Sequence, residues 1–180
     1  NTTAVMTVTA TDADLPAQTI IFSISGGADA AKFAIDAHTG ALRFLAAPDF
    51  EAPADAGGDN VYNVQVRAND QNGLTSTKNV AVTVQPVNDN APVITSSAAA
   101  NVNENTTAVL TVTATDADLP AQTVTFSNNG GDDAALFAID SATGELAFVA
   151  APDYEAPADA DGDNVYEVEV LADDGNGLAT

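Results

Sequence analysis

The chain repeats itself with a period of 104 residues, and this constrains the fold more than any other feature of the sequence. Residues 1–76 align with residues 105–180 without a gap, and 55 of these 76 positions are identical. Such identity at a fixed period is the signature of an array built from one repeated structural unit. The sequence therefore predicts two copies of the same small domain.

Within each copy the apolar residues alternate with polar ones, as in half-buried strands. Residues 108–114 place Leu110, Val112 and Ala114 on one side and threonines on the other. The same alternation is seen for Met6, Val8 and Ala10, for residues 164–171 and for residues 80–84. Gly-Gly and Thr-Gly pairs separate these runs, and the only helical segments expected are single turns at residues 30–33 and 134–137. We therefore predict an all-β fold of tandem immunoglobulin-like Greek-key β-sandwiches, with about seven strands per repeat, joined end to end.

The two copies are cut differently by the ends of the sequence. Repeat 1 is assigned to residues 1–90 and is expected to lack its first strand, whereas repeat 2, residues 91–180, is expected to lack its last. Two interpretations are open. The chain is a window on a longer array, or it is a subunit whose missing strands come from neighbouring chains by strand addition.

The charge and residue content exclude several function classes. There are 26 Asp and Glu residues against four Lys and Arg residues, and the last basic residue is Lys78. Repulsion excludes nucleic acid as a partner. The absence of cysteine and the presence of a single histidine, His38, exclude zinc sites and Cys/His nucleophiles. We interpret His38 as a surface turn residue and the chain as a non-enzyme. Glycosidase chemistry at the Asp-x-Glu pairs is disfavoured, because they recur in each copy. No apolar run is long enough to span a membrane.

Acidic residues recur in four clusters that are far apart in the sequence. They are Asn103-Glu104-Asn105, the Asp-x-Asp pairs, the Asp-x-Glu pairs, and an Asp that follows Ala-x. The pairs are Asp12 and Asp14, Asp116 and Asp118, Asp49 and Glu51, and Asp153 and Glu155, and the last cluster contributes Asp70 and Asp174. A strand-like backbone would place both carboxylates of a pair on one side, about 6.5–7 Å apart. That spacing suits two carboxylates that flank one divalent ion.

The linker between the copies reads Pro86-Val87-Asn88-Asp89-Asn90-Ala91-Pro92. Prolines at both ends stiffen it, and its side chains are rich in oxygen, which suits a hard cation that takes about 6–8 oxygen ligands. A plain polar linker is the alternative.

These motifs together resemble the cadherin repeat. The order x-Glu-x, Asp-x-Asp, Phe33-Ala34-Ile35-Asp36 followed by Thr39-Gly40, Asp-Phe/Tyr-Glu, Ala-x-Asp and Asn-Asp-Asn-Ala-Pro covers essentially the whole chain, and most motifs occur twice. The Ala/Thr/Asp-rich composition and the loop Asp-Ala-Asp-Gly-Asp-Asn-Val-Tyr resemble, more narrowly, the cadherin-like repeats of giant secreted or surface adhesins of bacteria.

The resemblance implies calcium held between successive repeats. The residues carried over as metal ligands are Asp49, Glu51, Val87, Asn88, Asp89, Asn90, Asp116, Asp118 and Asp174, with Val87 and Asn88 contributing backbone carbonyls. Glu104, Asp153 and Glu155 would form half of the following junction, and Asp12, Asp14 and Asp70 half of the preceding one. Two departures weaken the set: the x-Glu-x residue of repeat 1 is absent, and Pro86 stands where the family has Asp.

A weaker metal candidate is the loop that contains Asp159, Asp161 and Asp163. Its glycine comes too early for an EF-hand, and repeat 1 has Gly57 in place of the middle acid. We favour a hairpin turn for this loop over a calcium site.

The predicted function is that of a calcium-rigidified, extracellular stalk in a cell-surface or secreted adhesin, for example in a biofilm. Its expected partners are neighbouring repeats, identical chains in homophilic or filament contacts, or surface glycans. The alternatives are a self-assembling filament subunit completed by strand donation, and a carbohydrate-binding module, which the scarcity of aromatic residues disfavours.

Overall fold

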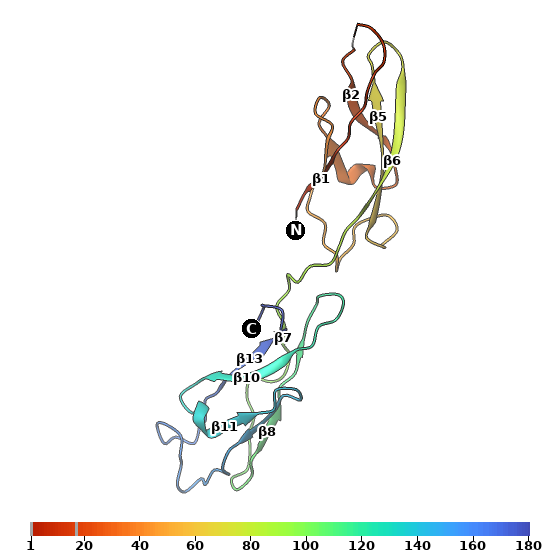
Figure 1. The fold of residues 1–180 in the computed structure, drawn as a ribbon. Coiled ribbons are helices and arrows are strands. Elements are labelled where there is room, and N and C mark those ends of the chain that lie inside the picture. The colour runs from red at the N-terminus through yellow and green to blue at the C-terminus, as the bar shows by residue number, and fades with distance from the viewer. Residues whose placement is uncertain (1, 17) are drawn as a thin grey trace. The chain divides into compact units, whose positions relative to one another are not determined.

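The computed structural model describes residues 2–16 and 18–180, which form two compact units. The first unit ends at Pro86 and the second begins at Val87. Figure 1 shows that each is built from strands, with one short helical turn. The turns are η1 (Ala30–Lys32) and η2 (Ala134–Leu136), as the sequence predicted. Among the described residues no helix has the length and apolar character needed to cross a membrane.

The first unit is a two-sheet sandwich of six strands. One sheet has the order β1 (Ala4–Thr7), β4 (Ala41–Phe44), β3 (Phe33–Ile35), and the other has the order β2 (Ile21–Gly26), β5 (Val61–Asn69), β6 (Thr75–Thr83). All pairs are antiparallel, and β5 and β6 are paired along their full nine residues.

Aromatic rings fill the space between these sheets. Phe33 and Phe44 stack with ring centroids 4.6 Å apart, and Tyr62 meets Phe44 edge-on at 5.0 Å. Leu42 and Val64 are each 2% exposed beside them. The alternation predicted for the first strand is right for Val8, which packs on this core, and wrong for Met6, which is 47% exposed. The register of β1 shifts between Ala4 and Met6, and Val5, which lies between them, packs on the core.

The described residues of the second unit form seven strands in three small sheets. They are β7 (Val93–Ile94), β8 (Ala108–Thr111), β9 (Ala114–Thr115), β10 (Thr125–Gly130), β11 (Phe137–Ile139), β12 (Glu145–Phe148) and β13 (Glu169–Asp173). The sheets run β11-β12-β8, β10-β13 and β7-β9. The single strand predicted at residues 108–114 is thus divided in two, because β8 pairs with β12 and β9 with β7.

The strand expected from residue 164 begins only at Glu169. In the first unit the corresponding residues 61–64 pair with residues 80–83 of β6. Residues 165–168 lie outside the strands of the second unit. Tyr166 is half-buried, whereas Tyr62 is 2% exposed.

Candidate metal centre

The Asp-x-Asp pair of the second unit lies directly after β9 and forms a tight turn. The backbone N–H of Asp118 donates to Asp116 Oδ1 at 2.8 Å. The prediction that a strand-like backbone spaces these two carboxylates is therefore wrong. An Asp side chain that accepts the amide two residues later closes an Asx turn, which competes with an extended ladder. The turn still keeps the two carboxylates together.

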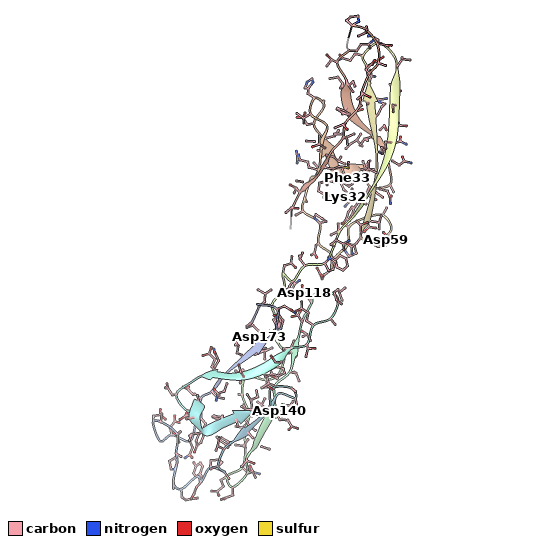
Figure 2. The ribbon with its side chains drawn as sticks, viewed as in Figure 1. Lys32, Phe33, Asp59, Asp118, Asp140 and Asp173 are labelled. Atoms are coloured by element: carbon pink, nitrogen blue, oxygen red, sulfur yellow. The ribbon has the colours of Figure 1, made fainter. Side chains whose placement is uncertain are left out.

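The Asp118 carboxylate is 1% exposed, and amide side chains surround it. The Asn90 side-chain amide donates to Oδ1 at 2.7 Å, and Gln122 Nε2 donates to Oδ2 at 3.1 Å. Gln122 Nε2 also lies 2.7 Å from Asn88 Oδ1. The oxygen-rich linker thus covers Asp118, and Figure 2 labels this residue at the end of the second unit where the chain enters it.

Asp174 supplies a third carboxylate from the turn after β13. Its Oδ1 accepts the N–H groups of Asn176 at 2.7 Å and Leu178 at 3.1 Å. Burial alone would raise the pKa of Asp174, but these hydrogen bonds, with a contribution from Asn88, hold it below the ordinary value. The side chain is therefore an anion at neutral pH, although it is only 3% exposed.

Asp116, Asp118 and Asp174 each bring one carboxylate oxygen to within 4.8 Å of the other two. Asp116 Oδ2 and Asp174 Oδ2 are buried and accept no hydrogen bond. Residues 79–180 contain no Lys or Arg that could neutralise the group. Buried, unpaired carboxylates are costly, and oxygens spaced in this way fit a calcium ion bound at about 2.3–2.6 Å from each. The donor set therefore fits Ca²⁺.

The corresponding residues of the first unit are arranged differently. The turn is the same, with the N–H of Asp14 donating to Asp12 Oδ1 at 2.8 Å, and Asp70 Oδ2 is likewise buried without a partner. However, Asp14 is exposed, whereas Asp118 is buried under the side chains of Asn90 and Gln122. In the described part of the chain, Asp12, Asp14 and Asp70 do not come close enough together to form a three-carboxylate group.

The remaining predicted ligands lie at three other places. Glu104, Asp153 and Glu155 bring their oxygens within 4.8 Å of one another on the second unit, and all three are exposed. The N–H of Tyr154 donates to Glu104 Oε2 at 3.2 Å, which ties the x-Glu-x segment to the Asp-x-Glu turn. Asp49 and Glu51 form the equivalent turn of the first unit, in which the N–H of Glu51 donates to Asp49 Oδ1 at 3.0 Å. Asp89 and Val87 are exposed on the linker.

Asp159, Asp161 and Asp163 also form a group with oxygens within 4.8 Å. The Asp163 carboxylate, followed by burial and by contact with Asp159, raises the pKa of Asp161. The favoured interpretation of this loop as a hairpin turn is wrong. It joins β12 to β13, and these strands lie in different sheets and do not pair.

Several polar residues that shape these sites were missed in the sequence. Gln122 and Asn176 are hydrogen-bonded to each other, and they donate to Asp118 and Asp174 respectively. Asp29 and Asp133 are buried and accept backbone N–H groups at the ends of the loops that precede β5 and β13. Their signal was present, because the copies have Gln18 and Gln122, Asn72 and Asn176, and Asp29 and Asp133 at matching positions. Identity between copies does not by itself separate such residues from ordinary turn residues.

Family models match a cadherin domain over residues 1–85 and again over residues 98–180. The chain therefore belongs to the cadherin domain family and contains two such domains, as the sequence resemblance predicted.

The relatives include animal cadherins. Rabbit (Oryctolagus cuniculus) cadherin-16 is 38% identical over 157 residues, which is 77% of this chain and 18% of cadherin-16. Human protocadherin gamma-A2 is 39% identical over 114 residues, 59% of this chain and 12% of the relative. The chain thus spans less than a fifth of the length of these proteins.

Solved structures show the same fold. Repeats EC1-2 of human protocadherin-24 superpose with a TM-score of 0.66 at 26% identity, covering 89% of this chain and 73% of that one. Repeats EC22-24 of mouse cadherin-23 give a TM-score of 0.60 at 27% identity, covering 99% and 55%.

Proposed function

We propose that the chain is part of an extracellular array of cadherin repeats that calcium stiffens at the junctions, and that the array serves as a structural or adhesive stalk. The observation that carries this proposal is the Asp116–Asp118–Asp174 group, with its two buried, unpartnered oxygens and no basic residue nearby. Asp49 and Glu51 of the first domain, with Asp89 and the Val87 and Asn88 carbonyls, would complete the calcium shell. Membership in the cadherin family supports a binding and structural module over an enzyme.

The mechanism is a population shift. A cation that binds only when the acids of two successive domains come together favours that arrangement over all others. Without the cation, the same acids repel one another. Extracellular calcium would therefore favour one arrangement of the two domains, and removing the calcium would allow other arrangements.

Calcium titration of the 180-residue chain tests the site. We expect Asp116→Asn to weaken calcium binding by about tenfold or more, which corresponds to about 1.4 kcal/mol, since it removes a charged ligand with a buried free oxygen. Isothermal titration calorimetry provides the measurement.

Asp12→Asn is the matched control, because Asp12 occupies the same position in the first domain without a covering linker. It is expected to leave the tightest calcium site unchanged. If the wild-type chain takes up no calcium at millimolar concentration, or if both variants lose it equally, the proposed junction site is wrong.

A narrower proposal concerns the kind of array. The Ala/Thr/Asp-rich composition supports repeats of a giant bacterial adhesin, while the relatives named above are animal proteins. Homophilic contact between identical chains remains part of the proposed adhesive role.

A further inference from the structure

The loop of residues 159–164, here named the Asp159 loop, has a natural counterpart in residues 55–60, the Asp55 loop. The two sequences differ only at their third position, where Asp161 replaces Gly57. The chain therefore contains a matched pair of loops that differ by one carboxylate.

Each loop is held by a buried aspartate that accepts two backbone N–H groups, Asp133 for the Asp159 loop and Asp29 for the Asp55 loop. Asp133 is 5% exposed, and its two oxygens accept the N–H groups of Ala160 at 2.7 Å and Glu167 at 2.9 Å. Asp29 binds Ala56 and Asn63 in the same way, at 2.6 and 2.7 Å. The backbone frame of each loop is thus fixed independently of the third position.

The first acid of each loop is buried, but only one of the two is fully paired. Asp55 accepts the N–H groups of Asn60 and Asp59, one on each oxygen, both at 3.1 Å. Asp159 is 8% exposed and accepts the N–H of Asp163 on Oδ2 at 2.7 Å, while its Oδ1 is buried and has no hydrogen-bond partner. The unpartnered oxygen occurs in the loop that carries the extra carboxylate.

The three acids of the Asp159 loop converge. One oxygen of each lies within 4.8 Å of the others, about twice the distance from a calcium ion to a ligand oxygen. In the Asp55 loop a side chain at the third position would also point toward the other two acids. A Cβ added at Gly57 would lie 3.1 Å from Asp59 Oδ1 and 3.2 Å from Asp55 Oδ2. A side chain at this position therefore starts between the other two carboxylates.

A small cavity beside the loop is lined by further acids. Its volume is about 90 Å³, and its walls include Asp132, Asp133, Asp161, Asp163 and Glu167. Residues 79–180 have no Lys, Arg or His to balance this charge. Oxygen ligands without nitrogen or sulfur favour a hard cation over zinc or copper. Calcium accepts irregular sets of carboxylate ligands, whereas magnesium demands near-ideal octahedral geometry, so three carboxylates from one loop favour calcium.

We propose that the Asp159 loop binds a calcium ion within the second repeat, at a site separate from the Asp116–Asp118–Asp174 group, and that the Asp55 loop does not. The ion would be held by one oxygen each of Asp159, Asp161 and Asp163, with water completing its shell. This site belongs to a single domain and does not depend on a junction between repeats.

Nuclear magnetic resonance of the ¹⁵N-labelled 180-residue chain, titrated with CaCl₂, tests the site residue by residue. We expect the backbone amides of Gly162, Asp163 and Val165 to shift saturably, while those of Gly58 and Asp59 stay in place. Asp161→Asn should weaken this response by about tenfold or more, since it removes a charged ligand from an exposed position and leaves the fold intact.

Two further variants separate this site from the junction. Asp116→Asn should leave the response of the Asp159 loop unchanged even where it abolishes junction binding, so the two proposals can fail independently. Gly57→Asp should give the Asp55 loop a new calcium response. The proposal is wrong if the amides of the Asp159 loop do not shift at millimolar CaCl₂, or if Asp161→Asn responds as strongly as wild type. An equal response to MgCl₂ would overturn the choice of calcium.

Discussion

Seven aspartates are buried in the described part of the chain, and each accepts at least one backbone N–H. Asp118 differs from the others because the side chains of Asn90 and Gln122 also donate to its carboxylate. The chain has only four Lys and Arg residues, so hydrogen bonds from amides stabilise the buried carboxylates that ion pairs stabilise in other proteins. Asp116, Asp159 and Asp174 each have a buried oxygen without a partner and also belong to a group of three carboxylates, and there we propose a cation. Asp70 has such an oxygen but belongs to no such group in the described residues.

The carboxylates at the Thr-Gly turns make the stability of each domain depend on pH. The N–H groups of Thr143 and Ala142, with the Thr143 hydroxyl, lower the pKa of Asp140 from 3.8, and Thr39 and His38 do the same for Asp36. Because the folded pKa lies below the unfolded one, the stabilisation is complete above the ordinary value and is lost as the pH falls through the lowered one.

We therefore expect wild type to be more stable than Asp140→Asn at pH 7, and this difference to shrink as the pH falls from about 5 to about 2. Denaturant unfolding at each pH, with calcium chelated, provides the measurement. Asp140 and Asp118 are both labelled in Figure 2, and Asp140 belongs to none of the groups of three carboxylates in the described residues, so the metal group does not enter the comparison. A difference that stays constant with pH would show that the charge of Asp140 does not matter.

At the scale of elements, turns rather than strands position the functional oxygens. Asp-x-Asp and Asp-x-Glu segments close Asx turns in both domains, at Asp12, Asp49, Asp116 and Asp153. The strands fix the positions of the turns, and the turns orient the carboxylates. Glycines at the ends of other turns allow the chain to pass close to a neighbouring strand.

Gly40 and Gly58 provide a matched test of such a close approach. Both have a left-handed backbone, with φ of 71° and 67°, but a Cβ at Gly40 would lie 2.1 Å from the Val8 carbonyl oxygen, whereas Gly58 has nothing within 4 Å. We expect Gly58→Ala to cost about 1–2 kcal/mol through backbone strain alone, and Gly40→Ala to cost about 2 kcal/mol or more beyond that. Denaturant midpoints of the two variants measure the difference, and equal midpoints would contradict the overlap seen at Gly40.

At the scale of the whole molecule, the proposed function predicts that calcium changes the joint and leaves the domains folded. Each domain has its own aromatic core, with matching ring pairs at 4.6 and 5.0 Å, so each is expected to keep its fold when the cation is removed. The acids of the proposed junction would then repel one another, and the distribution of domain arrangements would widen.

Small-angle scattering with and without a chelator measures this change, while circular dichroism monitors the fold. We expect chelation to broaden the distance distribution of wild type, and Asp116→Ala in calcium to resemble chelated wild type. Scattering curves of Asp116→Ala that match wild type in calcium would contradict the proposed role of the junction.

The all-β fold and the two domains follow from the sequence alone, and the resemblance to cadherin repeats implied that Asp116, Asp118 and Asp174 come together. The period of 104 residues, the alternation of apolar residues and the order of the acidic motifs are local or repetitive signals, which can be recognised without knowledge of contacts. The tertiary structure was needed to show that linker side chains help to bury Asp118, that Met6 is exposed, and that one aspartate oxygen in the Asp159 loop has no partner. Each of these facts depends on which distant segment packs against the residue, and residue type alone does not specify that segment.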